Sequence, residues 1–319
     1  MSDSTLEKEA PTELAGLRLD QALARMFPQF SRSRLKAWVL EGGITVDGER
    51  WKPRETVSGG ERIIVQVREA AEVRSEPEPI ELDVAYEDDA LVVINKPAGL
   101  VVHPGAGNAT GTLMNGLMHQ YPELKNLPRA GIVHRIDKDT TGLLIVARTL
   151  ESHTALVRQL AERSISRQYD AVCLGVLTGG GTIDAPIRRH PVDRKRMAVD
   201  PDGKPAVSHY TVVERFAAHT WVKVSLETGR THQIRVHFAW RRQPLVGDPV
   251  YGGRLALPAG ASDALIEALR GFRRQALSAT ALKLEHPETG EALEIRIEPP
   301  EDFRRLTEAL AADQAMRLE

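Results

Sequence analysis

Two carboxylates stand close together in the segment from Gly131 to Gly142, just before an apolar stretch over residues 143–148. Asp137 and Asp139 lie two residues apart, and a pair of carboxylates can perform general acid and base chemistry. Polar residues on a loop that is held by a rigid strand are typical of functional sites. Asp and Thr also cap turns for purely local reasons, so the spacing alone leaves a turn as the alternative.

A second polar segment covers residues 226–237. A strand pattern ends at its start, Gly229 allows a tight turn, and Thr231 predicts a helix start. Arg230 stands at this junction, where a guanidinium can bind a carboxylate through two hydrogen bonds. A purely structural salt bridge is an equally open interpretation. The predicted helix carries Gln233, Arg235 and His237.

The histidines of this segment do not predict a metal site. His232 and His237 are five residues apart, which does not place them on one face of a helix. No cysteine or acidic set accompanies them, and Cys173 is the single cysteine of the chain. Glycine-rich phosphate loops, nucleophilic serine elbows and dinucleotide fingerprints are also missing from the sequence. We therefore expect neither a metal nor a cofactor.

Basic residues gather in short stretches. Residues 188–196 carry a net charge of +4, and further basic residues flank the start of a helix predicted near residue 31. Such clusters bind phosphate, although many charge runs are merely solvated. The RNA-binding candidates are Arg32, Arg34, Lys36, Arg135, Arg188, Arg189, Arg194 and Lys195.

For two further residues, spacing alone predicts no functional role. Lys96, in the Asn95–Gly99 turn after a strand pattern, has the pattern of a solvated charge. Tyr169 lies in a strand pattern, where packing in the core is the default role for an aromatic residue.

Composition places the chain among globular proteins. It has 319 residues, 42% hydrophobic and 27% charged, with a net charge of −2. No window of about 18 apolar residues predicts a transmembrane helix, and the first 13 residues do not resemble a secretory signal. A cytoplasmic protein is the simplest expectation.

The elements that must position these residues fall into two groups. Residues 14–67 predict two short helices, at 17–26 and 31–41, and strands at 44–46 and 62–67 joined in part by an Asp47–Gly48 turn. The later sequence predicts strands at 84–86, 90–95, 143–148, 168–174, 207–214, 221–226 and 279–285, and helices at 112–119, 151–163, 261–272 and 302–318. Hairpins with scattered helices predict an α+β fold with a mixed, mainly antiparallel sheet, beside a small α/β N-terminal module.

These patterns divide the chain as follows. We expect a disordered tail at 1–13, a small module at 14–67, an acidic, proline-containing linker at 68–80, a larger domain at 81–310 and a C-terminal helix end at 311–319.

At this point the sequence resembles a known family. The segment His134–Gly142 resembles the signature of RNA pseudouridine synthases, with Ile136 in place of the usual Leu. Residues 229–237, 247–252 and 95–105 are similar to three further motifs of that family. The resemblance covers residues 14–310, and the first module is similar to an S4-like RNA-binding domain. The segments 103–108 and 189–191 resemble the family's D-type branch, which acts on large-subunit rRNA.

The resemblance implies roles for three residues. It makes Asp137 the catalytic carboxylate, Arg230 its salt-bridge partner and Tyr169 the aromatic residue that packs on the target base and assists proton removal at C5. Asp139 falls at a variable motif position, which weakens the carboxylate pair. A base that leaves its stack loses a few kcal/mol, and stacking on an aromatic ring recovers about 1–3 kcal/mol.

The resemblance also implies partners and a reaction. The expected enzyme is an isomerase that converts uridines of 23S rRNA to pseudouridine in a hairpin loop, helix 69, on free rRNA or on a pre-ribosomal or assembled large subunit. We expect a monomer with no membrane partner. A related synthase for other rRNA uridines, a non-catalytic RNA-binding assembly factor and a glycoside hydrolase that uses Asp137 remain alternatives.

Overall fold

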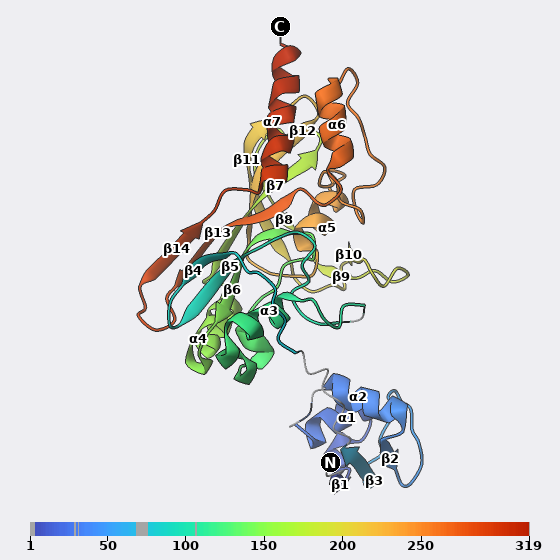
Figure 1. Cartoon of the computed structure of the whole chain (residues 1–319). Helices are drawn as coiled ribbons and strands as arrows, with labels where there is room; N and C mark the ends of the chain where they lie inside the picture. The colour runs from blue at the N-terminus through green and yellow to red at the C-terminus, as the bar shows by residue number, and fades with distance from the viewer. Residues whose placement is uncertain (1–3, 29, 31, 68–75, 106, 319) are drawn as a thin grey trace. The chain divides into compact units, whose positions relative to one another are not determined.

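The computed structural model describes residues 4–28, 30, 32–67, 76–105 and 107–318 (Figure 1). The chain divides into two compact units, Met1–Arg74 and Ser75–Glu319. The division falls inside residues 68–80, where the sequence predicts a linker; residues 68–75 of that linker lie outside the described residues. Each unit has a hydrophobic core of its own.

The first unit packs two helices on a three-stranded sheet. Helices α1 (Leu19–Met26) and α2 (Arg32–Glu41) precede β2 (Ile44–Val46) and β3 (Arg62–Val67). The sheet order is β1-β3-β2, and both pairings are antiparallel. Residue 31, where the sequence predicts the second helix to begin, is outside the described residues. Leu23, Leu35 and Trp38 are fully or almost fully buried between helices and sheet.

The predicted disordered tail at 1–13 is wrong for most of its length. Residues Ser4–Glu9 form β1 along the free edge of β3, and Thr12–Leu14 form a short 3-10 helix. The sequence does not predict β1 because its side chains are mostly charged. An edge strand that faces solvent does not need alternating apolar residues. Arg62 pairs with Glu7 across the two strands at 2.6 Å.

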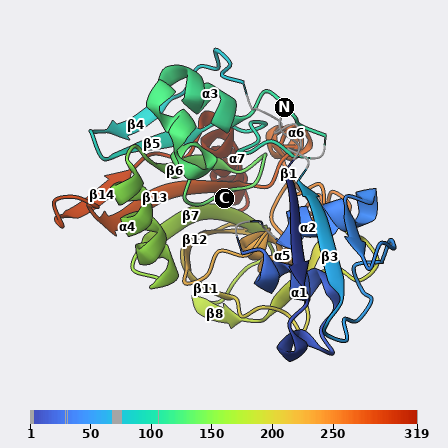
Figure 2. The same ribbon diagram turned by 90° about the horizontal axis from the view of Figure 1, so that it is seen from below.

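The second unit is built on one large sheet. Its strands are β4 (Val84–Glu87), β5 (Leu91–Lys96), β6 (Thr141–Ala147), β7 (Ser166–Leu174), β8 (Gly181–Asp184), β11 (Val207–Arg215), β12 (His219–Leu226), β13 (Leu277–Glu285) and β14 (Ala292–Arg296). The order is β4-β5-β6-β13-β7-β12-β11-β8, which Figure 2 shows from β4 to β8, and β14 pairs with β13. Only β6 and β13 run parallel in the described part of this sheet. The predicted α+β class with a mainly antiparallel sheet is therefore confirmed.

Helices cover the two faces of this sheet. On one face, α3 (Leu113–Gln120) and α5 (Gln233–Trp240) pack on the side chains of β5, β6 and β7 that include Ile94, Leu144 and Ala171. On the other face lie α4 (Leu150–Ala161), α6 (Asp263–Gly271) and α7 (Glu301–Met316). Helices α6 and α7 lie side by side (Figure 1). Cys173 is buried in the sheet, on the face that carries α3 and α5.

A small hairpin stands beside α5. Strands β9 (Ile187–Arg189) and β10 (Met197–Val199) pair antiparallel and contain the basic run 188–196 at their turn. The sequence predicts a basic loop here, and the structure gives it two short strands. A helix–strand contact joins α5 to β10.

The edges of the second unit differ from the expected boundaries. Residues 76–80 already belong to it, because Asn115 donates to the carbonyl of Glu76 and Ile80 packs on the core. At the other end, α7 continues without a break through residue 310, and Asp313 is buried. No helix in the described part of the chain is long and apolar enough to cross a membrane.

Candidate active site

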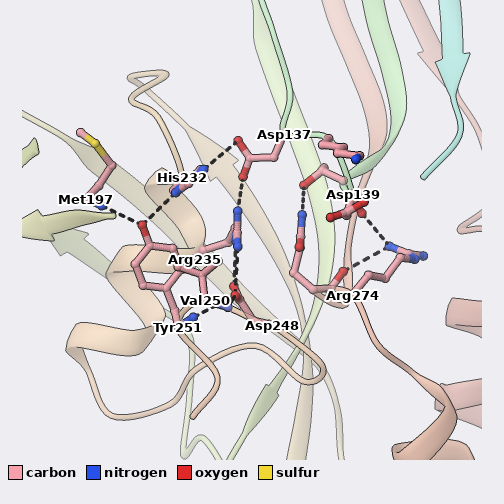
Figure 3. A network of polar contacts seen from close by, with 12 residues as sticks. Asp137, Asp139, Met197, His232, Arg235, Asp248, Val250, Tyr251 and Arg274 are labelled. Atoms are coloured by element: carbon pink, nitrogen blue, oxygen red, sulfur yellow. Dashed lines mark hydrogen bonds and ion pairs between the residues drawn. The ribbon is translucent and has the colours of Figure 1, made fainter. Parts of the chain in front are cut away.

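The segments singled out in the sequence meet on the face of the sheet that carries α5. Figure 3 shows Asp137 between His232 and Arg235, with Asp248 and Tyr251 on the far side of Arg235. Asp137 lies on the loop before β6, His232 and Arg235 lie at the start of α5, and Asp248 and Tyr251 lie on a turn that follows it.

The loop of Asp137 is anchored where β6 begins. The amide of Thr140 donates to the carbonyl of Asp137 at 3.1 Å and closes a turn. Gly142 has a φ of +102°, and a Cβ there would lie 2.1 Å from the carbonyl oxygen of Ala279 on β13. Only glycine allows this approach. The polar loop therefore ends at a fixed point of the central sheet.

His134 fixes the other side of the same loop. Its Nε2 accepts a hydrogen bond from the amide of Ile145 on β6 at 3.0 Å. Burial lowers the pKa of His134 to about 3, and the charge of Arg167 adds to this effect. The imidazole is therefore neutral at physiological pH, as an acceptor must be.

Lys96 also supports the loop that carries Asp137. Its interpretation as a solvated charge is wrong. The side chain is completely buried, and Nζ donates to the carbonyls of Pro97, Leu100 and Lys138 at 2.7–2.9 Å. Burial lowers its pKa to about 7, although the charges of Asp139 and Asp137 oppose that shift. Lys96 thus links the turn at 96–100 to the loop of Asp137.

Asp139 makes no ion pair within the described residues. Its carbonyl accepts from Arg274 at 3.4 Å, and Arg274 is itself held by Asp302 at 2.7 Å. The local contact is thus a backbone one, which fits the turn interpretation of Asp139.

Arg235, and not Arg230, holds Asp137. Its Nη1 donates to Oδ2 of Asp137 at 2.9 Å, while Nε and Nη2 bind both oxygens of Asp248 at 2.7 and 3.0 Å. Arg230 instead donates from Nε to the carbonyl of Pro205 at 3.0 Å. The predicted Arg230–Asp137 salt bridge is wrong, because Arg235 in the first turn of α5 projects toward Asp137 (Figure 3).

Asp248 orients Arg235. Its side chain is fully buried and also accepts from the amides of Val250 and Tyr251 at 2.8 and 2.9 Å. Burial alone would raise the pKa of Asp248, but the hydrogen bonds and charge of Arg235 lower it. Burial also acts to lower the pKa of Arg235, but the neighbouring carboxylates of Asp248 and Asp137 raise it. A planar guanidinium suits two carboxylates at once, and a lysine cannot copy this geometry.

Tyr169 lies on the same face of β7 as the core under the site. Its residue neighbours across the sheet are Val224 and Ala279, and the side chain is 6% exposed. Burial raises its pKa; the charge of Arg167 opposes this shift, and that of Asp137 adds to it. The phenol is therefore neutral and close enough to Asp137 to sense its charge. No residue in the described ranges hydrogen-bonds the hydroxyl.

The RNA-binding candidates of the first unit have different environments. Arg32 forms an ion pair with buried Asp20 at 2.7 Å, so part of its charge stabilises the fold. Arg34 lies over the ring of Trp38, 5.0 Å from the centroid. Lys36 is exposed.

In the second unit, the remaining RNA-binding candidates are exposed residues. Arg135 is exposed two residues before Asp137. Arg188 pairs with Asp200 at 3.4 Å, and Arg189 donates to the carbonyl of Arg194. Arg194 and Lys195 are exposed at the β9–β10 turn. The structure therefore gathers Asp137, Tyr169 and Arg235, whereas the basic residues are spread over the surface of both units.

The arrangement presents one carboxylate oxygen for chemistry. Arg235 occupies Oδ2 of Asp137, and Oδ1 lies 3.9 Å from Nε2 of His232. A carboxylate oxygen that no arginine occupies can act as a nucleophile or as a base. Among the described residues, no group of three or more His, Cys, Asp or Glu side chains gathers as a metal site requires.

Comparison with known families agrees with the fold. A family model described as RNA pseudouridylate synthase matches residues 90–240, and an S4 domain model matches residues 17–63. The chain belongs to the RNA pseudouridine synthase family, and its second unit contains the matched catalytic region. The sequence-based family assignment is therefore confirmed.

Individual proteins and a solved structure are also similar to this chain. Proteins named ribosomal large subunit pseudouridine synthase D from Xanthomonas campestris and Pseudomonas aeruginosa are 54% and 55% identical to this chain. The alignments cover 99% and 96% of this chain and 96% of each relative. A solved structure of human RNA pseudouridylate synthase domain containing 4 is 25% identical, with a TM-score of 0.56, and covers 72% of this chain and 93% of that one.

Proposed function

We propose that this enzyme isomerises uridines of large-subunit rRNA to pseudouridine, with Asp137 as the catalytic carboxylate. The observation that carries the proposal is the Asp248–Arg235–Asp137 chain of ion pairs, in which Arg235 and Asp248 are buried and Asp137 is partly exposed. The substrate class rests on the relatives that are named for the large subunit. By resemblance, the target lies in the hairpin loop called helix 69 of 23S rRNA.

The reaction needs no redox cofactor because it is an isomerisation. The N1–C1′ bond of uridine breaks, the uracil turns, and a C5–C1′ bond forms; the C5 proton leaves to solvent and N1 gains a proton. Asp137 acts through Oδ1, since Oδ2 is bound to Arg235. Attack on the sugar or the base, charge stabilisation at C1′ and removal of a sugar proton are all open to a carboxylate oxygen here.

Tyr169 and the basic residues serve substrate binding in this proposal. A neutral aromatic ring next to Asp137 can pack on a base that has left its stack. The exposed Arg194 and Lys195 of the β9–β10 turn, with Arg135, suit contacts to phosphates. The first unit, which matches an S4 domain, adds a second basic surface around Lys36. The enzyme acts in the cytoplasm as a monomer, on rRNA that is free or within a pre-ribosomal particle.

Release of tritium from rRNA labelled at uridine C5 tests the assignment. Wild type is compared with Asp137→Asn on free transcript and on unmodified large subunits. We expect release by wild type alone, and RNA affinity of the variant within about threefold of wild type because the substitution keeps the size of the side chain. Turnover by a clean Asp137→Asn preparation would remove Asp137 from the chemistry. No release from either substrate would reject large-subunit rRNA.

A further inference from the structure

A chain of three hydrogen-bonding groups ends beside the catalytic carboxylate. The amide of Met197 donates to the hydroxyl of Tyr251 at 2.9 Å. The same hydroxyl lies 2.8 Å from Nδ1 of His232. The other ring nitrogen of His232, Nε2, lies 3.9 Å from Oδ1 of Asp137 (Figure 3). Tyr251 is 8% exposed, so water competes little for this contact.

The direction of these hydrogen bonds follows from the donors. An amide N–H can only donate, so Met197 uses an acceptor lone pair of the Tyr251 oxygen. The phenolic proton is then free to be donated to Nδ1 of His232. A neutral imidazole that accepts at Nδ1 must carry its proton at Nε2. That proton is on the side of the ring that faces Asp137.

Burial keeps the ring of His232 neutral. Burial lowers its pKa; Asp137 and Asp248 oppose this shift, and Arg235 and Arg135 add to it. Burial raises the pKa of Tyr251, so the phenol keeps its proton as well. If the Tyr251 hydroxyl accepts from Met197 and donates to Nδ1 of His232, every hydrogen-bonding group in this pair is used; the opposite tautomer would leave the buried phenolic proton without this acceptor.

The backbone at His232 also holds the ring in place. His232 is the residue before α5 and has a φ of +57°, in the left-handed region that few residues other than glycine and asparagine adopt readily. Such a conformation persists where surrounding contacts impose it. The rings of His232 and Tyr251 meet edge to face, 5.6 Å between centroids.

We propose that Tyr251 is a positioning residue that locks His232 in its Nε2–H tautomer, so that this N–H is aimed at Oδ1 of Asp137 and orients the reacting oxygen. Arg235 and His232 then fix the carboxylate from two sides. This role rests on the proposed function of Asp137. It also links the RNA-facing hairpin to the site, because Met197 begins β10 and Arg196 lies over the Tyr251 ring at 5.3 Å.

The tautomer can be read without any activity. Side-chain ¹⁵N–¹H correlation spectra of the free full-length protein distinguish Nδ1–H from Nε2–H histidines, and His232→Asn assigns the His232 signals. Asn is chosen because it tolerates the left-handed backbone. We expect wild type to show Nε2–H only and Tyr251→Phe to show a mixture of tautomers. An Nδ1–H signal in wild type, or unchanged His232 signals in Tyr251→Phe, would overturn the proposal.

Single-turnover kinetics tests the consequence for catalysis. Tyr251→Phe keeps the ring between its Arg neighbours and removes only the hydroxyl, so we expect a single-turnover rate about tenfold lower, with RNA affinity within twofold. His232→Asn is expected to lose at least as much, and His232→Gln, which retains an amide donor near the Nε2 position, to lose less. Weaker RNA binding with an unchanged rate would show a merely structural role.

A matched control is available in the same unit. Tyr210 is also buried, and its hydroxyl accepts from Arg241 at 2.6 Å, away from His232. Tyr210→Phe removes a comparable hydrogen bond, and we expect its rate to stay within twofold of wild type. A rate loss equal to that of Tyr251→Phe would assign both effects to general destabilisation. If wild type itself gives no turnover, the proposed function fails, while the tautomer measurement still decides the role of Tyr251.

Discussion

The side chain of Asp137 is held by a guanidinium that also binds a second carboxylate. Arg235 binds Asp248 through two nitrogens and Asp137 through the third, and its side chain is 5% exposed. Asp248 carries no exposed surface, so its charge depends entirely on Arg235 and two backbone amides. A buried carboxylate that loses its partner is strongly destabilising.

Replacement of Arg235 is therefore expected to damage both the fold and the chemistry. Arg235→Gln should lower the free energy of unfolding by about 3 kcal/mol, because Asp248 stays buried without its counter-charge. Tritium release should fall by roughly 100-fold or more, since Asp137 loses its anchor. Urea denaturation and the C5 release assay measure the two effects.

Arg230→Gln is the matched comparison, because Arg230 lies five residues away and its side chain hydrogen-bonds only the Pro205 carbonyl in the described structure. We expect its unfolding free energy to change by less than about 0.5 kcal/mol. Equal losses in the two variants would contradict the assignment of Arg235 as the partner of Asp137.

The sequence predicted the participants of this site better than their pairing. Asp137 and Tyr169 were selected through their motif positions, and the structure places them within electrostatic reach of each other. Arg230 was assigned as the partner of Asp137 through the resemblance, and its place at the strand-to-helix junction suited that role. Which of two nearby arginines reaches Asp137 depends on where α5 begins and hence on the direction in which each side chain projects. The helix begins after His232, whose left-handed backbone cannot be recognised from the spacing of the residues. Lys96 was missed because its burial depends on three carbonyls from two loops that lie far apart in the sequence.

At the scale of elements, two connections hold the site: the turn at 96–100 under the catalytic loop and the β9–β10 hairpin beside α5. Both were hard to predict from sequence. The first requires that two distant loops exchange backbone hydrogen bonds, such as Gly99 to Lys138 at 3.1 Å. The second has strands of three residues each, too short for an alternation pattern. The longer strands and helices were predicted to within a few residues, because their buried faces impose a clear period.

The buried Lys96 predicts a pH dependence of stability. Burial lowers its pKa from 10.5 to about 7 in the folded state, so between these values the unfolded chain binds the additional proton. Stability therefore rises with pH from about 7 to 10.5, by up to about 1.4 kcal/mol per pH unit, and this contribution is constant below pH 7.

Lys96→Met removes the titrating group. We expect the unfolding free energy of the variant, measured in urea, to lack this rise, so that the difference between wild type and variant changes across the window. Parallel curves between pH 7 and 10 would contradict the lowered pKa.

The hairpin predicts a salt-dependent affinity. Arg194→Gln with Lys195→Gln removes two exposed charges, so RNA binding should weaken for all sequences and the slope of log K against log salt should become shallower by roughly 1.5. Arg188→Gln is the internal comparison, because Arg188 is already paired with Asp200 and should change the slope less. The slopes are measured by titration of fluorescent rRNA fragments at several salt concentrations. An unchanged slope in the double variant would remove the hairpin from the RNA contact.

At the scale of the whole molecule, the chain consists of two units with separate cores. The division between these units falls inside the charged, proline-containing stretch at 68–80, where the sequence predicts a linker. The sequence placed the outer edges less well, since β1 and the end of α7 lack the patterns on which those boundaries relied.

Removal of residues 1–74 tests the role of the first unit. Because Ser75–Glu319 has its own core, we expect the shortened enzyme to remain folded, with kcat within about twofold of the full chain. KM for rRNA should rise roughly tenfold, through loss of a few phosphate contacts. Circular dichroism verifies folding, and the release assay gives kcat and KM. An unchanged KM would show that the first unit does not contribute to binding of that substrate.

The position of β13 has a consequence for synthesis of the chain. This strand, near residue 280, lies between β6 and β7, which leave the ribosome more than 100 residues earlier. Until it emerges, the facing edges of β6 and β7 have no partner, and the loop of Asp137 lacks the strand against which Gly142 docks. Non-local strand pairing is slow, and unpaired edges invite aggregation. The central sheet can therefore close only after β13 has left the ribosome, and we expect the nascent chain to expose two unpaired strand edges until then.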